Sequence, residues 1–171
     1  GLYSKREMIE DAIARFENLP DTAQLSVARF NGQPVWGDAS GVAALYGKSQ
    51  ALDLSLAEAR QTLNGLLDTD SFLNWMAVNT YLGNANLHGE LYLYRVGDGL
   101  WKFATGDFAY AFSSASDNSI ARLVKQENTR FSWGKAAELA DRMLQQPEYQ
   151  EAFLAKLGAL YQAWPADVMQ A

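Results

Sequence analysis

Five polar residues within the stretch 79–112 have side chains that could act on phosphate and metal. They are Asn84, Asn86, His88, Glu90 and Asp107. Carboxylate oxygens are ligands that magnesium prefers, and an imidazole or a carboxylate can accept a proton from a reacting hydroxyl. These residues therefore indicate either a phosphoryl-transfer site or a site of this kind that has lost its activity.

The elements around these residues place them on two loops. Hydrophobic spacing predicts a helix over residues 71–82, with Asp70 as its N-cap and Gly83 as its stop. The runs ELYLYRV and LWKFAT flank Gly97-Asp98-Gly99 and predict a hairpin whose side chains alternate between two faces. Asp107 follows this hairpin and opens a polar loop.

Two capping-box patterns predict the starts of further helices. Ser4 and Glu7 have the spacing that satisfies free N–H groups of a first turn, so we expect a helix over residues 5–18. Ser55 and Glu58 repeat the pattern and predict a helix that continues through Leu67.

Another hairpin is predicted over residues 25–38. Asn31-Gly32 suits a type I′ turn, and Pro34 is typical of an edge strand. Residues 39–54 show no clear period, and we expect a hinge or lobe junction there.

The last third of the chain predicts two helices, over residues 132–146 and 147–164. The second begins at Pro147, because proline is favoured at the first helical position. The order of helices and hairpins predicts an α+β fold whose second half is mostly helical.

Composition sets outer limits on function. The 171 residues suit one domain, with or without a small appended lobe. The net charge is −6 without a run of Lys or Arg, so nucleic acid is not expected as a partner. The absence of cysteine excludes disulfides and thiol nucleophiles, and no apolar run is long enough to predict a membrane span. The start GLYSKREM lacks an initiator Met and a signal-peptide pattern, so we expect an excerpt of a longer chain.

The run DTDSFLNWMAVNTYLGNANLHGELYLYR, followed by GLWKFATGDFAYAF, resembles the spore-coat protein H (CotH) kinase family. GLYSKREMIEDAI and LADRMLQQPEYQEAFLAKLGALY resemble flanking segments of the same family. The resemblance implies an atypical protein-kinase-like fold, with residues 1–50 as a partial upper lobe (helix and hairpin) and 51–171 as the lower lobe. A more distant likeness is to HipA-type kinases, whose catalytic-loop spacing Gly83, Asn84 and His88 fit.

The resemblance also implies ATP and Mg²⁺ as cofactors, and protein Ser or Thr as substrate in an exported or surface protein. Asp107 matches a metal-binding Asp of the family, whereas Asn86 stands where the catalytic Asp is expected. Glu90 or Leu91 falls at the metal-binding Asn, and Ala109 replaces a second Asp. Asn84 is a candidate for the nucleotide site.

Alternatives remain open for each residue. His88 could replace the missing base or bond a backbone carbonyl, and Glu90 could join Asp107 on a metal or face solvent. Asp107 could instead close an Asx-turn, and Asn84 could satisfy the carbonyls that end the preceding helix. Two functions follow: a degenerate kinase-like module that binds a protein partner or has a structural role, or an active phosphotransferase.

Overall fold

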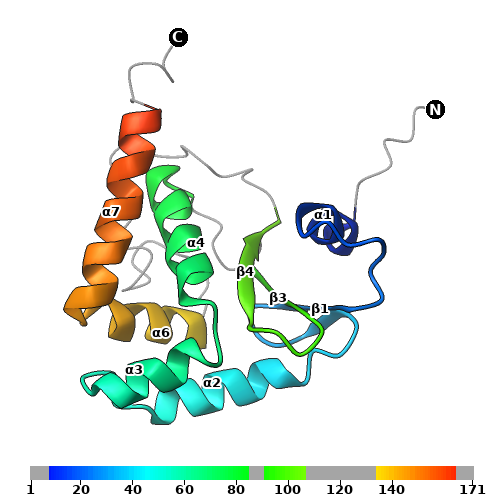
Figure 1. Ribbon diagram of the computed structural model, residues 1–171, viewed down its shortest axis with the longest axis horizontal. Coiled ribbons are helices and arrows are strands. Elements are labelled where there is room, and N and C mark those ends of the chain that lie inside the picture. The colour runs from blue at the N-terminus through cyan, green and yellow to red at the C-terminus, as the bar shows by residue number, and fades with distance from the viewer. Residues whose placement is uncertain (1–7, 85–90, 107–133, 165–171) are drawn as a thin grey trace.

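A computed structural model describes residues 8–84, 91–106 and 134–164 of the chain (Figure 1). Within these ranges the chain forms helices and one antiparallel sheet, a mixed content compatible with the α+β class. The elements are α1 (Ile9–Phe16), β1 (Leu25–Arg29), β2 (Pro34–Trp36), α2 (Gly41–Ala51), α3 (Ala57–Asn64), α4 (Thr69–Tyr81), β3 (Leu91–Val96), β4 (Lys102–Thr105), α6 (Lys135–Leu144) and α7 (Pro147–Ala163).

The sheet has four strands in the order β2-β1-β3-β4. Pro34 opens β2 at one edge of the sheet, as predicted, because an edge strand tolerates the missing N–H. β1 pairs with β3, which follows it by about sixty residues of chain, so strands from both sides of residue 50 share one sheet. The division into lobes at residue 50 stays a prediction.

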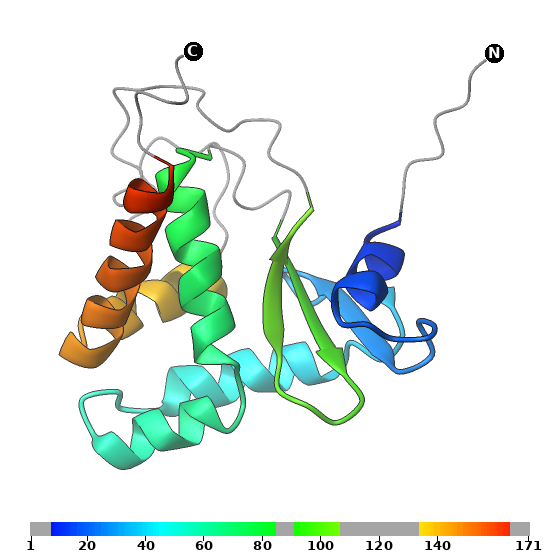
Figure 2. The ribbon, with the colours of Figure 1, turned by 45° about the horizontal axis from the view of Figure 1, so that its top comes forward.

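The two faces of the sheet belong to different cores. Leu91 and Leu93 of β3 join the larger core, which also contains Phe72 and Met76 of α4. Tyr94 points to the other face and packs with residues of α1, among them Ile13. The predicted alternation along this strand is therefore confirmed. Figure 2 shows the hairpin β3–β4 between α1 on one side and α4 on the other.

The outer edge of β4 is covered by α4 and by the residues that precede it. The Trp101 N–H donates to the Leu66 carbonyl, and the Asp68 N–H donates to the Trp101 carbonyl at 2.8 Å. One turn further along, the Phe103 N–H donates to Ser71 Oγ at 3.1 Å. These bonds satisfy backbone groups that an edge strand leaves open, and they fix β4 against the start of α4.

Residues 39–54 do have a helical period, and most of them form α2. Its buried positions are Val42, Leu45, Tyr46 and Ser49, which have the i, i+3, i+4, i+7 spacing of a helix face. The reading of this segment as lacking a period is wrong, because a serine occupies one buried position and two glycines lower the helix propensity of the segment. The hinge or lobe junction expected here stays a prediction.

Three predicted helix starts are also wrong. Met8 has an extended backbone and precedes α1, which therefore begins at Ile9 and not near Ser4. Ser55 donates its hydroxyl to Asp53 at 2.7 Å, and α3 begins two residues after it, at Ala57. The side chain of Asp68 caps α4 by accepting from Ser71 N at 2.9 Å, in place of Asp70. Neighbouring Ser and Asp residues have similar capping ability, so only the path of the backbone decides between them.

The turn between β1 and β2 differs from the type I′ prediction. Gly32 has a φ of 84°, but among the described non-glycine residues only Asn18 has a positive φ, so Asn31 does not fulfil the type I′ geometry. The register between β1 and β2 shifts at Val27–Ala28. The shift lets a turn with a single left-handed residue close the hairpin.

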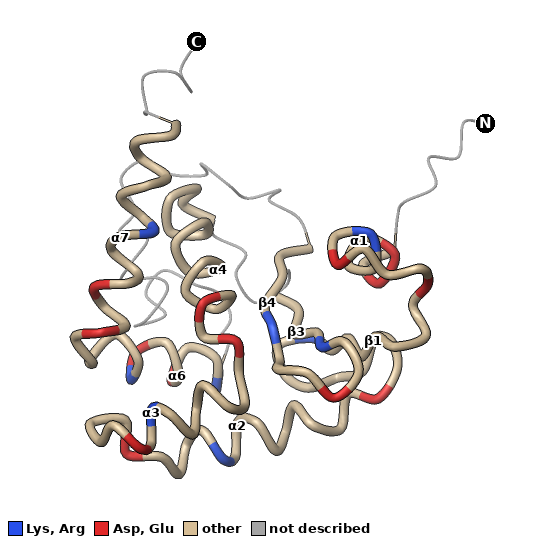
Figure 3. Tube along the Cα trace, in the orientation of Figure 1, with Lys and Arg blue, Asp and Glu red and all other residues tan. Residues whose placement is uncertain are grey.

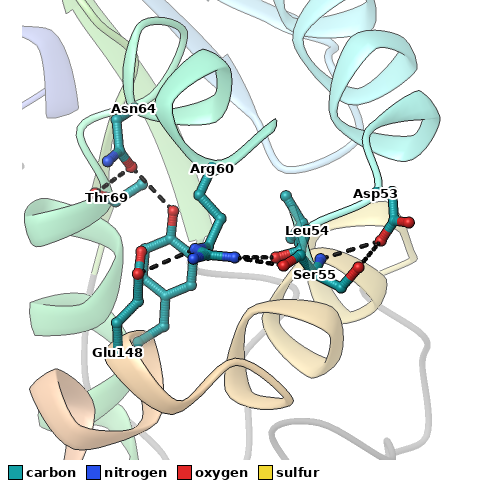
Figure 4. A network of polar contacts seen from close by, with 8 residues as sticks. Asp53, Leu54, Ser55, Arg60, Asn64, Thr69 and Glu148 are labelled. Carbon is teal, nitrogen blue, oxygen red and sulfur yellow. Dashed lines mark hydrogen bonds and ion pairs between the residues drawn. The ribbon is translucent and has the colours of Figure 1, made fainter. Parts of the chain in front are cut away.

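Polar contacts fasten the start of α7 to α3 (Figure 4). Arg60 Nε lies 3.0 Å from the Glu148 carboxylate, and its Nη1 donates to the Leu54 carbonyl at 2.9 Å. The Tyr149 hydroxyl donates to Asn64 Oδ1 at 3.0 Å. The predicted start of α7 at Pro147 is confirmed, and the Pro-Glu-Tyr sequence at this start anchors the last helix.

Charged residues of both signs are distributed over the described elements (Figure 3). In this part of the chain, no helix combines the length and apolar character needed to cross a membrane.

Candidate functional site

One of the five predicted site residues, Asn84, lies in the described part of the chain. Asn86, His88 and Glu90 fall within residues 85–90, and Asp107 opens residues 107–133; both ranges lie outside the description. Among the described residues, no three His, Asp or Glu side chains gather as a metal site would require. The predicted roles of these four residues therefore stay predictions.

Asn84 is part of a buried pair of amides. Its side chain Nδ2 donates to Asn79 Oδ1 at 2.8 Å, and its backbone N–H donates to the Asn79 carbonyl at 3.0 Å. Both asparagines are only 2% exposed. This geometry agrees with the structural alternative for Asn84, in which it satisfies the end of the preceding helix, and its nucleotide contact stays a prediction.

Asn79 extends the same contacts to the sheet. Its Nδ2 donates to the Trp75 carbonyl at 2.8 Å and to Thr105 Oγ1 at 3.2 Å. Buried amides need partners for all their polar atoms, so this residue holds the end of α4, the residue that follows it and the end of β4 in one arrangement. We call Asn79, Asn84 and Thr105 the amide anchor.

The amide anchor brings together the chain positions from which both predicted site loops depart. Asn84 is the last described residue before the first loop, and Leu91 is the first residue after it. Leu91 pairs with Thr105, which lies two residues before Asp107. The first loop therefore begins and ends, and the second loop begins, at one side of the molecule, where α4 and the hairpin finish (Figure 1).

A cleft of about 400 Å³ runs between α1, α4 and β4 and reaches Thr105. Its lining includes Phe16 of α1, Ser71 and Asn74 of α4, and Lys102 of β4. The cleft thus lies against the amide anchor, and its walls carry both apolar and polar groups.

The half-buried carboxylate of Glu17 in this cleft joins the end of α1 to the sheet. Glu17 Oε1 accepts from Lys102 Nζ at 2.8 Å and from the Tyr94 hydroxyl at 2.7 Å. Burial acts to raise the pKa of Glu17, but the hydrogen bonds from Lys102 and Tyr94 and the Lys102 charge outweigh it, and the pKa falls below its ordinary value. Burial and the same carboxylate raise the pKa of Tyr94. The ionised Glu17 carboxylate therefore attaches the end of α1 to Tyr94 of β3 and Lys102 of β4.

Sequence reasoning missed two of these residues. Glu17 and Lys102 are 85 positions apart, and no local pattern pairs them. Glu7, which the sequence predicts as part of a capping box, lies outside the described residues. Asn79 did carry a signal, because it continues the buried helical spacing of Phe72, Trp75 and Met76 as a polar residue.

Comparison with known proteins places this geometry in a family. Residues 44–164 match the family model of the CotH kinase protein, which is more than half of the chain. The chain belongs to the CotH kinase family. No curated protein and no solved structure matches it.

The CotH match begins within α2 and ends just after α7. It includes α4, the hairpin β3–β4, the amide anchor and the Pro-Glu-Tyr start of α7. Of the segments that carried the resemblance, GLYSKREMIEDAI precedes the match and the others fall inside it. Helix α1 and strands β1 and β2 precede the matched residues. The CotH domain is therefore built on the larger core, to which the first 43 residues add two strands and a helix.

Proposed function

We propose that this CotH domain keeps the scaffold of a kinase-fold site, has lost phosphoryl transfer, and acts as a binding or structural module for a protein partner. The observation that carries the proposal is Asn86, at the position of the family's catalytic Asp. A carboxamide oxygen is not basic near neutral pH, so it can orient a hydroxyl but cannot take its proton. General-base catalysis contributes roughly 10²- to 10⁴-fold to a rate.

Further substitutions support the same conclusion. Ala109 stands where the family pattern has a second Asp, and Glu90 or Leu91 where it has a metal-binding Asn. Asp107 keeps its carboxylate, and with Glu90 it offers the hard oxygen ligands that Mg²⁺ prefers. When bound, ATP with Mg²⁺ would supply the phosphoryl group and neutralise its charge. Asp107 and Glu90 are the residues that would hold it.

The amide anchor supports placing the two loops at a shared pocket. Asn84 and Thr105 are joined through Asn79 by hydrogen bonds of 2.8 and 3.2 Å, and the pairing of Leu91 with Thr105 fixes the other end of the first loop. In this proposal Asn84 positions the loop that carries Asn86 and His88. Residues 1–50 form the partial upper lobe and residues 51–171 the lower lobe of the kinase-like fold.

Two measurements test the loss of transfer. Calorimetry with ATP and Mg²⁺ measures nucleotide binding, and transfer of labelled phosphate to the domain itself or to an added protein measures activity. We expect no transfer by the wild type, and we expect Asn86→Asp to gain transfer because it restores the missing base. Asp107→Ala should abolish both the gained transfer and any metal-dependent binding. Asp11→Ala is the matched control, since Asp11 is an exposed carboxylate on α1 and does not line the cleft beside the amide anchor.

An active enzyme is the competing function, because the only histidine of the chain, His88, follows Asn86 closely in sequence and Asp107 keeps its carboxylate. Label transfer by the wild type that is lost in Asp107→Ala would establish it and overturn the proposal. Loss of transfer in His88→Gln would then identify His88 as the replacement base, as in the HipA-like alternative.

Family membership suggests an exported or surface protein, which we include in the proposal. Fractionation of cells that produce the full-length protein tests it, and recovery with the cytoplasmic fraction alone would contradict it.

A further inference from the structure

A second pocket lies at the opposite end of the hairpin from the amide anchor. It has a volume of about 250 Å³ and is enclosed by α2, the segment that joins α3 to α4, and the turn between β3 and β4. Its lining includes two cations, Lys48 and Arg95, together with Trp101 and Gly41. The proposed kinase-like site uses none of these residues.

Arg95 is held in this pocket without a full set of partners. Its guanidinium lies 4.9 Å from the centre of the Trp101 ring, and its side chain is 22% exposed. Its ionic contact with Asp38 is 3.9 Å long, and its Nε is buried without a hydrogen-bond partner. A guanidinium carries five N–H donors, and leaving desolvated donors of a charged group unused is costly. The stacked cation is therefore pre-organised for an acceptor that the described residues do not supply.

Two nitrogen atoms converge on the first turn of α2. A Cβ atom at Gly41 would lie 3.3 Å from Trp101 Nε1 and 3.5 Å from Arg95 Nη1. Because residue 41 is glycine, both nitrogen atoms face a surface without a side chain. The first turn of α2 contains no acidic residue, and the positive end of the helix dipole adds to the attraction for an anion.

We infer that this pocket binds an oxyanion, the phosphate or carboxylate group of a ligand. Arg95 provides charged, directional donors, Trp101 provides an indole N–H, and the exposed Lys48 provides a second positive charge at the rim. Asp98 also lines the pocket. Its carboxylate and that of Asp38 offset part of the positive charge, so the affinity for a small anion is expected to be in the millimolar range, about 4 kcal/mol.

The indole N–H signals of the five tryptophans provide a direct measurement. The ¹H–¹⁵N spectrum is followed while inorganic phosphate, and in a second arm acetate, is added at constant ionic strength. The Trp101 signal should shift and saturate while the other indole signals stay in place. Tighter binding of phosphate identifies a phosphate site, and equal binding of both ions identifies a general oxyanion site.

Variants distinguish binding of the anion in this pocket from a general effect of added salt. Arg95→Gln should weaken binding by at least roughly tenfold, the effect of a lost hydrogen bond to a charged group. Lys48→Gln should weaken it and Asp98→Asn should strengthen it, because both change only the charge at the rim. Gly41→Ala should obstruct the approach to the two nitrogen atoms. Lys135→Gln, an exposed cation on α6, is the control and should change nothing.

A Trp101 shift that does not saturate, or that is unchanged in Arg95→Gln, overturns the inference. Urea unfolding of each variant checks that it is folded. If Arg95→Gln does not fold, Lys48→Gln and Asp98→Asn decide alone, because both positions are on the surface: opposite changes in affinity support the site, and equal affinities overturn it.

Discussion

Helices α4 and α1 pack against the two faces of the same sheet in different ways. Eight of the thirteen residues of α4 are buried, and one of its aromatic rings, Phe72, lies 4.3 Å from the ring of Phe103 on β4. In α1 three of eight residues are buried, while Phe16 is 75% exposed. The contrast indicates that the CotH part of the chain carries most of the stability, and that α1 depends on a small apolar contact and on Glu17.

The difference in packing also means that the α4 side of the sheet is held rigidly, whereas the attachment of α1 can adjust. The amide anchor lies on the α4 side, where buried hydrogen bonds and close packing leave little freedom. The cleft next to it has α1 as its other wall. Movement of α1 would therefore change the width of the cleft without moving the anchor.

The largest change in the free energy of unfolding is expected when a phenylalanine on the α4 side is replaced, in comparison with one on α1. Phe72→Ala should lower the free energy of unfolding by about 3–5 kcal/mol, since its ring is fully buried against Phe103 and Trp75. Phe16→Ala should change it by less than about 0.5 kcal/mol, because the ring is mostly exposed. Urea denaturation measures both, and equal losses would contradict the comparison.

The next effect concerns the amide anchor. Asn79→Ala removes the acceptor of Asn84 Nδ2 and the donor to Thr105, leaving buried polar groups without partners, and should cost about 1–3 kcal/mol of unfolding free energy. Asn74→Ala, on the same helix, removes only an exposed bond to Asp70 and is the matched control. If Asn79→Ala is as stable as the control, the amides do not fix the two segments.

A pH effect should appear in the attachment of α1. The pKa of Glu17 lies below its ordinary value of 4.5 in the folded protein, because the bonds from Lys102 and Tyr94 outweigh the effect of burial. Ionised Glu17 therefore stabilises the folded state fully above pH 4.5, and this contribution is lost as the pH falls through the lowered pKa. Amide hydrogen exchange of α1 should accelerate in that range, and that of α4 should change less.

Glu17→Gln tests the cause of this pH effect. The variant should show faster exchange in α1 at neutral pH, with no further change of that origin on acidification. An unchanged pH profile in the variant would show that another group titrates.

The smallest effect is expected at the start of α7, within the better-packed region. Glu148 is paired with Arg60, but its side chain is 52% exposed, so Glu148→Gln should cost only about 0.2–1 kcal/mol. The loss should shrink at high salt. Glu151→Gln, at an exposed position on the same helix, is the control, and a larger loss there would contradict the assigned role of the pair.

Local chemistry predicted many elements of this fold. The period of Phe72, Trp75 and Met76 predicted α4, the alternation along β3 predicted a strand with two different faces, and Pro147 predicted the start of α7. The caps of the helices were less predictable, since Asp68 and Asp70 are two residues apart and both can accept an N–H bond. Helix α2 was missed because a buried serine interrupts its apolar face.

For the candidate site, too, some features could be predicted from the sequence and others could not. The residue types alone predicted that an amide, Asn86, stands where the family has a catalytic carboxylate and that Asp107 keeps its carboxylate, because the chemistry of a side chain is a property of its type. The three-dimensional fold decided which distant residues meet: Glu17 with Lys102, and Asn79 with Thr105. Such pairs depend on how strands and helices pack across 26 to 85 residues of chain, and a local hydrophobic period contains no information about partners at that separation.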